Sequence, residues 1–363
     1  MATATRPLSA IVLAAGAGTR MKSERPKPLH RLCGRTMLQF VLDSLADVDA
    51  RRAVVVVGHG ADRVTKKLQE EPGDVAVEFV EQRVQRGTGD AVSVALTAFD
   101  DGPDDDDDVI VLPGDTPLLK PSTIAQLVVA HQASDAACTL LSAQLPDPFG
   151  YGRVVRDRDA HVAKVVEEPD ATEEEREIDE VNTSIYCFRR SVLAPALRRL
   201  SPENAQGEYY LTDVVSVLHD AGYPVDSVLA TDPSETEGVN DRWQLARAES
   251  RLRRRINRGW LARGVGMVDP EHTYVDATVE LSPDVSIFPG AILQGHTVVG
   301  EGAEVGPGCR LVDCTIGAGA VLESTTARNA EVGDHARVGP FAVLEPGDVV
   351  PASSVTGPFY TST

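Results

Sequence analysis

Residues 275–311 read VDATVELSPDVSIFPGAILQGHTVVGEGAEVGPGCRL, and an aliphatic side chain returns at every sixth position. The residues in this register are Val275, Leu281, Ile287, Leu293, Val299, Val305 and Leu311. A six-residue repeat with one inward aliphatic is typical of a parallel β-helix, in which each repeat forms one side of a triangular coil. The period therefore predicts a β-helix in this part of the chain.

The register continues beyond Leu311 with one interruption. Ile316 and Leu322 follow after a five-residue step, and four further aliphatic residues then complete the series. These four are Val332, Val338, Leu344 and Val350. At three repeats per coil, the spacing predicts about four coils.

The N-terminal part of the chain has a different pattern, in which short apolar runs alternate with amphipathic stretches. The successive pairs are Leu8–Ala14 with Thr36–Leu45, Ala53–Val57 with Asp62–Leu68, and Asp108–Leu112 with Pro121–His131. Strands that alternate with helices at this spacing predict an α/β, Rossmann-like domain with a mainly parallel sheet and helices on both faces. The aspartate run 104–108 is interpreted as a solvated loop rather than a calcium site, because consecutive carboxylates cannot all point inward.

Between these two parts, residues 241–263 are predicted to form one long helix. Its basic run, residues 251–255, is interpreted as a solvated face rather than a nucleic-acid site. We therefore expect a first domain over residues 1–240, a linker helix over 241–264, a β-helix over 265–352 and a tail over 353–363.

Composition excludes several classes of function. The chain has 363 residues, 42% of them hydrophobic, and a formal net charge of −20. So acidic a chain predicts no nucleic-acid partner and no anionic-membrane partner, and no apolar run is long enough to span a bilayer. Five cysteines without a Cys-x-x-Cys pair indicate buried thiols in a reducing compartment, and the N-terminus carries no signal pattern. We expect a cytoplasmic protein.

A glycine-rich turn follows the first predicted strand. Residues 15–21 read AGAGTRM, which lacks the third glycine of a dinucleotide fingerprint and the Gly-Lys-Ser/Thr of a P-loop. Glycines let backbone N–H groups approach a phosphate or a base, and Arg20 and Lys27 lie beside the loop as candidate phosphate counter-charges. The alternative, two ordinary surface cations, stays open at this point.

Asp115 follows the strand that ends at Leu112. Ligands of open α/β sheets bind beyond the carboxyl ends of the strands, so a carboxylate there is placed to hold Mg²⁺ against phosphates. The alternative is a helix N-cap before Thr116.

Taken together, these stretches resemble the nucleoside-diphosphosugar pyrophosphorylases. The resemblance rests first on residues 13–21, LAAGAGTRM, with Pro26 and Lys27. Further motifs follow in the family's order: Gln82 with Gly87 and Thr88, FGYGR at 149–153, Val166-Glu167, EVNT at 180–183, QGEYYLTD at 206–213 and EGVND at 237–241. With the six-residue repeats, the chain resembles the bifunctional N-acetylglucosamine-1-phosphate uridylyltransferase/glucosamine-1-phosphate acetyltransferase family as far as about residue 350.

The resemblance implies a fold, an activity and roles for residues. The fold would be a nucleotidyltransferase domain followed by a left-handed β-helix, and the activity a Mg²⁺-dependent reaction of UTP with N-acetylglucosamine-1-phosphate. Its product, UDP-N-acetylglucosamine, is a precursor of the cell wall. Catalytic roles fall on Arg20 and Lys27, and metal ligation on Asp115 and Asn240. Nucleotide binding is implied for Leu13, Ala14, Ala15, Gly16, Lys27, Gln82, Gly87, Thr88, Gly114 and Asp115, and sugar binding for Gly152, Glu167, Asn182 and Asn240.

Two departures from the family pattern leave the substrate open. Pro113 stands where the family usually has an aromatic residue, and Ser184 where a glycine is expected. The alternatives are a nucleotidyltransferase for another sugar phosphate or nucleotide, and a non-catalytic scaffold that retains the fold.

The β-helix is predicted to assemble the protein rather than to catalyse. In the family the acetyltransferase site lies in later coils, whereas this sequence stops at Thr363 and has Val343-Leu344-Glu345-Pro346 where arginines are expected. We therefore expect no acetyl transfer, and the resemblance implies a homotrimer that forms through the β-helix.

Overall fold

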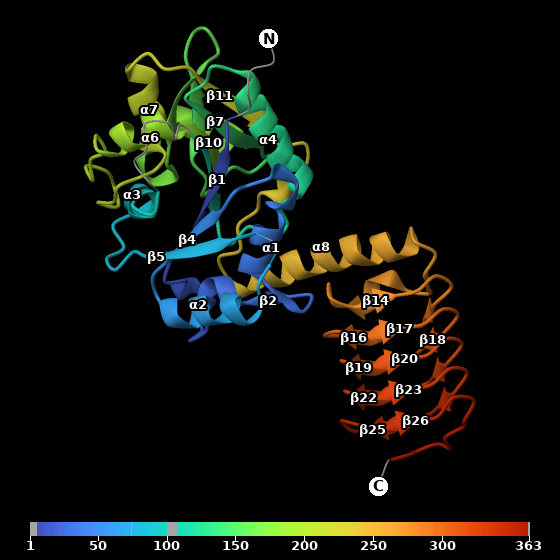
Figure 1. Cartoon of the computed structure of the whole chain (residues 1–363). Helices are drawn as coiled ribbons and strands as arrows, with labels where there is room; N and C mark the ends of the chain where they lie inside the picture. The colour runs from blue at the N-terminus through green and yellow to red at the C-terminus, as the bar shows by residue number, and fades with distance from the viewer. Residues whose placement is uncertain (1–5, 74, 100–106, 362–363) are drawn as a thin grey trace. The chain divides into compact units, whose positions relative to one another are not determined.

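The computed structural model describes residues 6–73, 75–99 and 107–361 (Figure 1). The chain forms two compact units. The first comprises Met1–His30 and Thr36–Gln244, and the second comprises Arg31–Arg35 and Leu245–Thr363. Among the described residues, no helix is both long and apolar enough to cross a membrane.

The first unit is built on one mixed sheet. Its strands lie in the order β11-β7-β10-β6-β1-β4-β5, and the hairpin β8–β9 joins at β10. β10 runs antiparallel to β6 and β7, whereas the other neighbours along this order are parallel. The bounds are β1 Leu8–Leu13, β4 Ala53–Val57, β5 Val77–Glu81, β6 Asp108–Pro113, β7 Cys138–Gln144, β8 Arg153–Arg156, β9 Val162–Val166, β10 Glu180–Arg189 and β11 Val225–Leu229. The predicted Rossmann-like sheet is confirmed, with β10 as the antiparallel exception in its middle.

Helices cover both faces of this sheet, as the alternation predicted. Alternate side chains of β1 enter two different cores: Ala10 and Val12 lie in one, and Ile11 lies in the other. Buried residues of α1, α2 and α4 complete the first core, and those of α3, α6 and α7 complete the second. The bounds are α1 Met37–Asp43, α2 Ala61–Glu70, α3 Thr88–Leu96, α4 Pro121–Ala133, α5 Glu173–Arg176, α6 Arg190–Leu197 and α7 Asp213–Asp220. Because both faces are covered, the central strands are continuous apolar runs.

The aspartate run before β6 was predicted to be solvated, which is wrong for its last two residues. Asp107 and Asp108 are buried. Asp107 accepts a hydrogen bond from Ser9 Oγ at 3.0 Å and pairs with Arg190, while Asp108 Oδ1 lies 2.7 Å from Arg6 Nε. Cations distant in sequence thus stabilise these two carboxylates, and the rest of the run, residues 104–106, lies outside the described residues.

The second unit is a β-helix of stacked short strands, consistent with a left-handed one (Figure 1). Its three parallel sheets each contain five strands, one more than the predicted number of coils. The bounds are β12 Gly266–Met267, β13 Tyr274–Val275, β14 Glu280–Leu281, β15 Ser286–Ile287, β16 Ile292–Gln294, β17 Val298–Val299, β18 Glu304–Val305, β19 Arg310–Val312, β20 Thr315–Ile316, β21 Val321–Leu322, β22 Thr326–Arg328, β23 Glu331–Val332, β24 Arg337–Val338, β25 Val343–Leu344 and β26 Val349–Val350. The count of about four coils is corrected because two strands, β12 and β22, lie outside the aliphatic series.

The gap in the aliphatic register between Leu322 and Val332 is filled by a smaller side chain. Ala327 on β22 is buried and lies between Leu311 and Leu344 in the same sheet. A second buried position, two residues before most of the aliphatic residues, holds smaller residues, among them Cys309 and Cys314. The described cysteines are all free and buried, as the composition predicted.

The long helix is confirmed as α8, Arg242–Leu261. The second unit also contains the tip of a hairpin formed by β2, Arg31–Leu32, and β3, Arg35–Thr36. In this tip, Cys33 N–H donates to Glu249 Oε2 at 3.0 Å, and Ala277 N–H donates to the Cys33 carbonyl at 2.9 Å. Burial and the Glu249 carboxylate raise the pKa of the Cys33 thiol far above its usual value. The compact units therefore differ from the expected domain boundaries: residues 31–35 pack with the β-helix, and most of α8 belongs to the same unit.

Candidate active site

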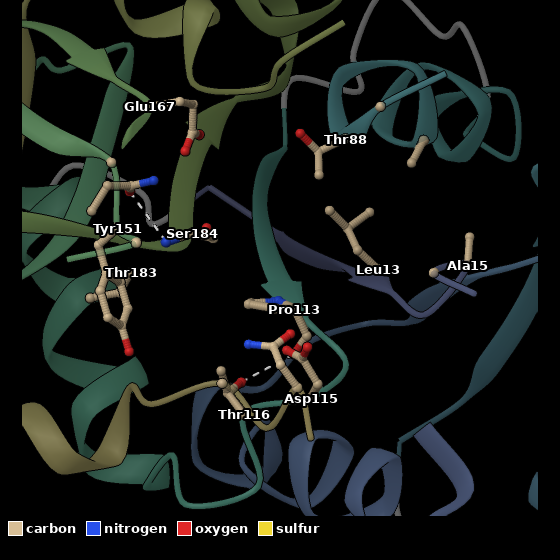
Figure 2. A pocket seen from close by; sticks show the side chains of 18 of the residues that line it. Leu13, Ala15, Thr88, Pro113, Asp115, Thr116, Tyr151, Glu167, Thr183 and Ser184 are labelled. Carbon is tan, nitrogen blue, oxygen red and sulfur yellow. Dashed lines mark hydrogen bonds between the residues drawn. The ribbon is translucent and has the colours of Figure 1, made fainter. Parts of the chain in front are cut away.

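A cavity of about 670 Å³ opens in the first unit, at the carboxyl ends of β1 and β6 (Figure 2). This is the edge where an open α/β sheet binds its ligands. In Figure 2, Leu13 and Ala15 come from the end of β1 and its loop, and Pro113 and Asp115 from the end of β6. Its volume suits a nucleotide-sized ligand.

The glycine-rich loop forms one wall of the cavity. A Cβ built at Gly16 would meet no atom within 4 Å, whereas one at Gly18, whose φ is +62°, would lie 2.6 Å from Lys27 Cβ. Gly16 therefore leaves space for a ligand to approach the backbone, and Gly18 makes room for the stem of Lys27. Arg20 lines the same cavity and is exposed.

Lys27 joins two residues that are distant in sequence. Its ammonium donates to Asn240 Oδ1 at 2.7 Å and forms an ion pair with Asp115 Oδ2. All three side chains are in the first unit, and we call them the Lys27 cluster. A carboxylate oxygen and an amide oxygen thus converge on one cation, which is the donor set that Mg²⁺ accepts.

Asp115 is positioned by two glycines. A Cβ built at Gly114 would lie 3.0 Å from the carbonyl oxygen of Leu13, so the chain after β6 passes close to the end of β1. Gly238 faces the other side of Asp115, where a Cβ would lie 3.5 Å from Oδ1. Asp115 is not the helix N-cap of the alternative interpretation, because α4 begins at Pro121 with Lys120 as its N-cap.

Gln82, directly after β5, is fixed by its own loop. Its amide nitrogen donates to the Gly87 carbonyl at 3.1 Å and to Asp90 Oδ2 at 2.8 Å. The remaining polar group of this side chain is its amide oxygen, an acceptor. Gly87 has a φ of +112°, and a Cβ there would lie 2.5 Å from the Tyr209 carbonyl oxygen, so this turn requires glycine.

Three residues in or next to β8, β9 and β10 form the opposite wall, which we call the acceptor end: Gly152, Glu167 and Asn182. Asn182 N–H donates to the Gly152 carbonyl at 2.8 Å, and Thr212 Oγ1 donates to Glu167 Oε1 at 3.0 Å. A Cβ at Gly152 would lie 3.4 Å from Glu167 Oε2. In Figure 2, Glu167 lies across the cavity from Asp115.

Burial raises the pKa of the Glu167 carboxyl, and the carboxylates of Asp213 and Asp170 raise it further, against the hydrogen bond from Thr212. Burial and Asp170 also raise the pKa of Asp213. Burial and the neighbouring carboxylates thus destabilise the charged form of Glu167. Such a site favours a ligand that brings hydrogen-bond donors, as sugar hydroxyl and amide groups do.

The structure brings together most of the residues that the sequence singled out. Those that line the cavity are Leu13, Ala15, Gly16, Arg20, Gln82, Gly87, Thr88, Asp115, Gly152, Glu167, Asn182 and Asn240. Lys27 contacts Asn240, which lines the cavity, whereas Ala14 and Gly114 are not among the described residues that line it. Residues missed by the sequence reasoning include Gln85, Thr116, Phe149, Tyr151 and Gln244. Phe149 and Tyr151 belong to the FGYGR motif at 149–153, which could have identified them as site residues. No sequence pattern pointed to Gln85, Thr116 or Gln244.

One of the two departures has a structural consequence. Ser184 has a φ of +60°, a left-handed backbone conformation that glycine adopts with less strain than serine. It lies at an irregularity of β10 between Asn182 and Ile185. Its N–H donates to Asn182 Oδ1 at 3.2 Å. Serine therefore adopts the turn that glycine would make, and both Ser184 and Pro113 line the cavity.

The fold and the cavity define a nucleotidyltransferase. Residues 10–215 match the family model described as the MobA-like NTP transferase domain, which is more than half of the chain. The match covers the glycine-rich loop, Lys27, Asp115 and the acceptor end, so the chain is a nucleotidyltransferase enzyme.

Relatives that match nearly the whole chain show its particular family. The chain belongs to the family of the bifunctional protein GlmU. It is 44% identical over 351 residues to that protein from Desulfitobacterium hafniense, a match that covers 97% of this chain and 75% of the relative. It is also 44% identical over 357 residues to the protein of the same name from Streptomyces avermitilis, a match that covers 98% of this chain and 73% of that relative. The bifunctional protein GlmU from Thermobifida fusca is 46% identical to this chain over 331 residues, a match that covers 91% of this chain and 68% of that relative.

Proposed function

We propose that this chain transfers a uridylyl group from UTP to N-acetylglucosamine-1-phosphate and releases pyrophosphate. The observation that carries the proposal is that one cavity is lined by a glycine-rich loop, by Asp115 and Asn240 of the Lys27 cluster, and by the acceptor end. The first two suit a triphosphate and the third suits a sugar. Membership of the GlmU family supports the same assignment.

Asp115 and Asn240 would hold a divalent cation, which we propose to be Mg²⁺. Their oxygens already converge on one cation, the Lys27 ammonium, so the donor set fits. Among the described residues, no three histidine, cysteine, aspartate or glutamate side chains gather as a metal site. A two-ligand site agrees with this, because Mg²⁺ takes its other ligands from phosphates and water. When bound, it would neutralise charge on the triphosphate.

The chain's own residues then have to position the reactants rather than activate them. A sugar phosphate is already an anionic nucleophile: its oxygen forms the new bond to the α-phosphorus, and the bond to the pyrophosphate oxygen breaks with its electron pair. Lys27 and Arg20 would stabilise the charge on the triphosphate, and Glu167 and Asn182 would orient the sugar. No histidine or cysteine is among the described residues that line the cavity, which suits a reaction without a covalent intermediate.

The fixed orientation of Gln82 supports uracil as the base. Both donors of its amide are held by Gly87 and Asp90, which leaves an acceptor for the ligand. The N3–H of uracil can donate to that oxygen, whereas cytosine has an acceptor at the same position. UTP should therefore be preferred to CTP, since a buried acceptor facing an acceptor loses its hydrogen bond.

The glycine-rich loop gives a prediction with a matched control. Gly16→Ala should raise the KM for UTP about tenfold or more, because the new methyl group projects into the space meant for the ligand. The melting temperature should hold, since nothing in the protein lies within 4 Å. Gly18→Ala is the control that acts on the protein instead: it should lower the melting temperature, because its Cβ meets Lys27 at a positive φ. Equal effects of both variants on stability would contradict this assignment.

Glu167 gives a prediction about pH. As the pH falls through its raised pKa, the protonated carboxyl loses an acceptor, so the KM for sugar phosphate should rise while the KM for UTP stays nearly constant. Glu167→Gln should raise the KM for sugar phosphate about tenfold at neutral pH and remove this pH dependence, apart from the titration of the substrate itself.

The same shift has a consequence for stability. A carboxyl with a raised folded pKa contributes stability below its unfolded pKa, and that contribution is lost as the pH rises through the folded value. Glu167→Gln should therefore melt at a higher temperature than the wild type at neutral pH. A lower melting temperature of Glu167→Gln would contradict this consequence, and equal effects on both KM values would contradict a role of Glu167 in binding the sugar.

A substrate panel tests the proposed function. Pyrophosphate release is measured for the full chain with UTP, CTP, dTTP, ATP and GTP, each against N-acetylglucosamine-1-phosphate, glucosamine-1-phosphate and glucose-1-phosphate, with Mg²⁺ and with a chelator. We expect the fastest Mg²⁺-dependent release from UTP with N-acetylglucosamine-1-phosphate. A faster pair would change the substrate, and release from no pair would favour the scaffold.

We further propose that the β-helix assembles the chain into a homotrimer. Its stacked strands present long outer faces that suit symmetric packing. Sedimentation of the full chain tests this, and a monomer would contradict it. Truncation near residue 264 is not a clean test, because it removes Ala277, a partner of the hairpin tip that starts four residues after Lys27.

We also propose that this stretch of chain transfers no acetyl group from acetyl-coenzyme A to glucosamine-1-phosphate. Glu345 places a carboxylate where an anionic substrate would need a cation, and the ring of His272 is held by Asp269, with Nδ1 2.7 Å from Oδ2. An acetyl-transfer rate comparable to the uridylyl-transfer rate would overturn this.

A further inference from the structure

Lys27 occupies the position at which the proposed metal would bind. Its ammonium is bonded to Asn240 Oδ1 at 2.7 Å and to Asp115 Oδ2, the two oxygens assigned to the metal. The Lys27 ammonium is thus the cation that these two oxygens hold in the structure.

The position of Lys27 is fixed by its surroundings. Its side chain is only 14% exposed, and that of Asp115 is 23% exposed. Its backbone lies in a short 3-10 helix, Lys27–Leu29, between Pro26 and Pro28, and its stem runs against Gly18. The loop therefore holds the stem of Lys27 and directs its ammonium toward Asp115 and Asn240.

An ammonium and a divalent cation compete for these oxygens. Asp115 Oδ2 and Asn240 Oδ1 already accept the protons of Lys27, and two cations this close repel in a partly buried site. We propose that Lys27 excludes the metal from the nucleotide-free enzyme, and that UTP opens the metal site by drawing the ammonium onto its phosphates. This inference rests on the proposed function.

The exchange requires that the triphosphate be the better partner for the ammonium. A triphosphate offers several anionic oxygens, whereas the cluster offers one carboxylate and one amide, and Arg20 in the cavity wall favours the same ligand. Metal and UTP then bind with positive coupling, each raising the affinity for the other. The metal enters with the nucleotide or after it, not before it.

Binding of Mn²⁺ to the nucleotide-free full chain, followed by electron paramagnetic resonance of the free ion, tests this directly. Wild type should bind Mn²⁺ weakly at this site. Lys27→Met keeps the aliphatic stem against Gly18 and should bind it about tenfold more tightly or better, because a competing charge is removed. The double variant Lys27→Met/Asp115→Asn should lose the gain, and Lys22→Met, an exposed lysine of the same loop, should match wild type.

Outcomes of this experiment separate the inference from the proposed function. Equal Mn²⁺ affinity of wild type and Lys27→Met, whether weak or tight, overturns the inference. The proposed metal site is tested separately with UTP present, by the water-proton relaxation that protein-bound Mn²⁺ enhances. Loss of that enhancement in Asp115→Asn supports the site, and unchanged enhancement refutes it whatever Lys27→Met does.

Discussion

Replacing Asp115 by asparagine should lower kcat about 10²–10³-fold, because it removes the charge that would hold the metal while keeping the shape of the side chain. The ion pair with Lys27 shows that this carboxylate binds a cation from this position. Asn240→Ala should act in the same direction but more weakly, since it removes a neutral oxygen. Steady-state rates measured over a range of Mg²⁺ concentrations check both effects.

Asp62→Asn is the matched control, because Asp62 is exposed on α2 and does not line the cavity. Its rates should equal those of wild type. Near-wild-type turnover of Asp115→Asn at limiting Mg²⁺ would rule out Asp115 as the principal ligand.

Lys27→Ala should lower kcat/KM for UTP by a similar factor, about 10²–10³-fold, through loss of the cation that would meet the triphosphate. The melting temperature should change by only a few degrees, since about 1 kcal/mol in a domain of this size corresponds to roughly 2–4 °C. Kinetics and a thermal melt of the same preparation check the two parts together.

Lys22→Ala, in the same loop, should leave both quantities unchanged, because Lys22 is exposed and does not line the cavity. A large loss of stability in Lys27→Ala, accompanied by a proportional loss of activity, would instead make Lys27 a structural residue.

The two architectures could be predicted from sequence because each has a local period. Burial on both sheet faces makes β1, β4 and β6 continuous apolar runs, and the six-residue repeat marks the β-helix. The six-residue pattern did not reveal one inward position. Ala327 is buried there, but alanine is too small to be recognised as one of the large aliphatic residues of the repeat. The resulting gap, together with the unrecognised first strand β12, led to a coil count that was too low.

The residues of the candidate site could also be named, but not their contacts. Lys27, Asp115 and Asn240 come from three distant segments, and no pattern in the sequence indicates that the lysine binds the side-chain oxygens of the other two directly. The buried Asp107 and Asp108 illustrate the same limit, because the cations that stabilise them, Arg190 and Arg6, are remote along the chain. The run of consecutive aspartates alone made these carboxylates look solvated.

We propose that uridylyl transfer takes place in one step between two substrates held in the cavity of the first unit. The most direct measurement is the stereochemical course at the α-phosphorus, using UTP that carries sulfur at that phosphorus in one configuration and N-acetylglucosamine-1-phosphate as acceptor. A single in-line displacement predicts inversion in the UDP-sugar product. Retention would contradict this proposal, because it requires two displacements and hence a covalent nucleotidyl–enzyme.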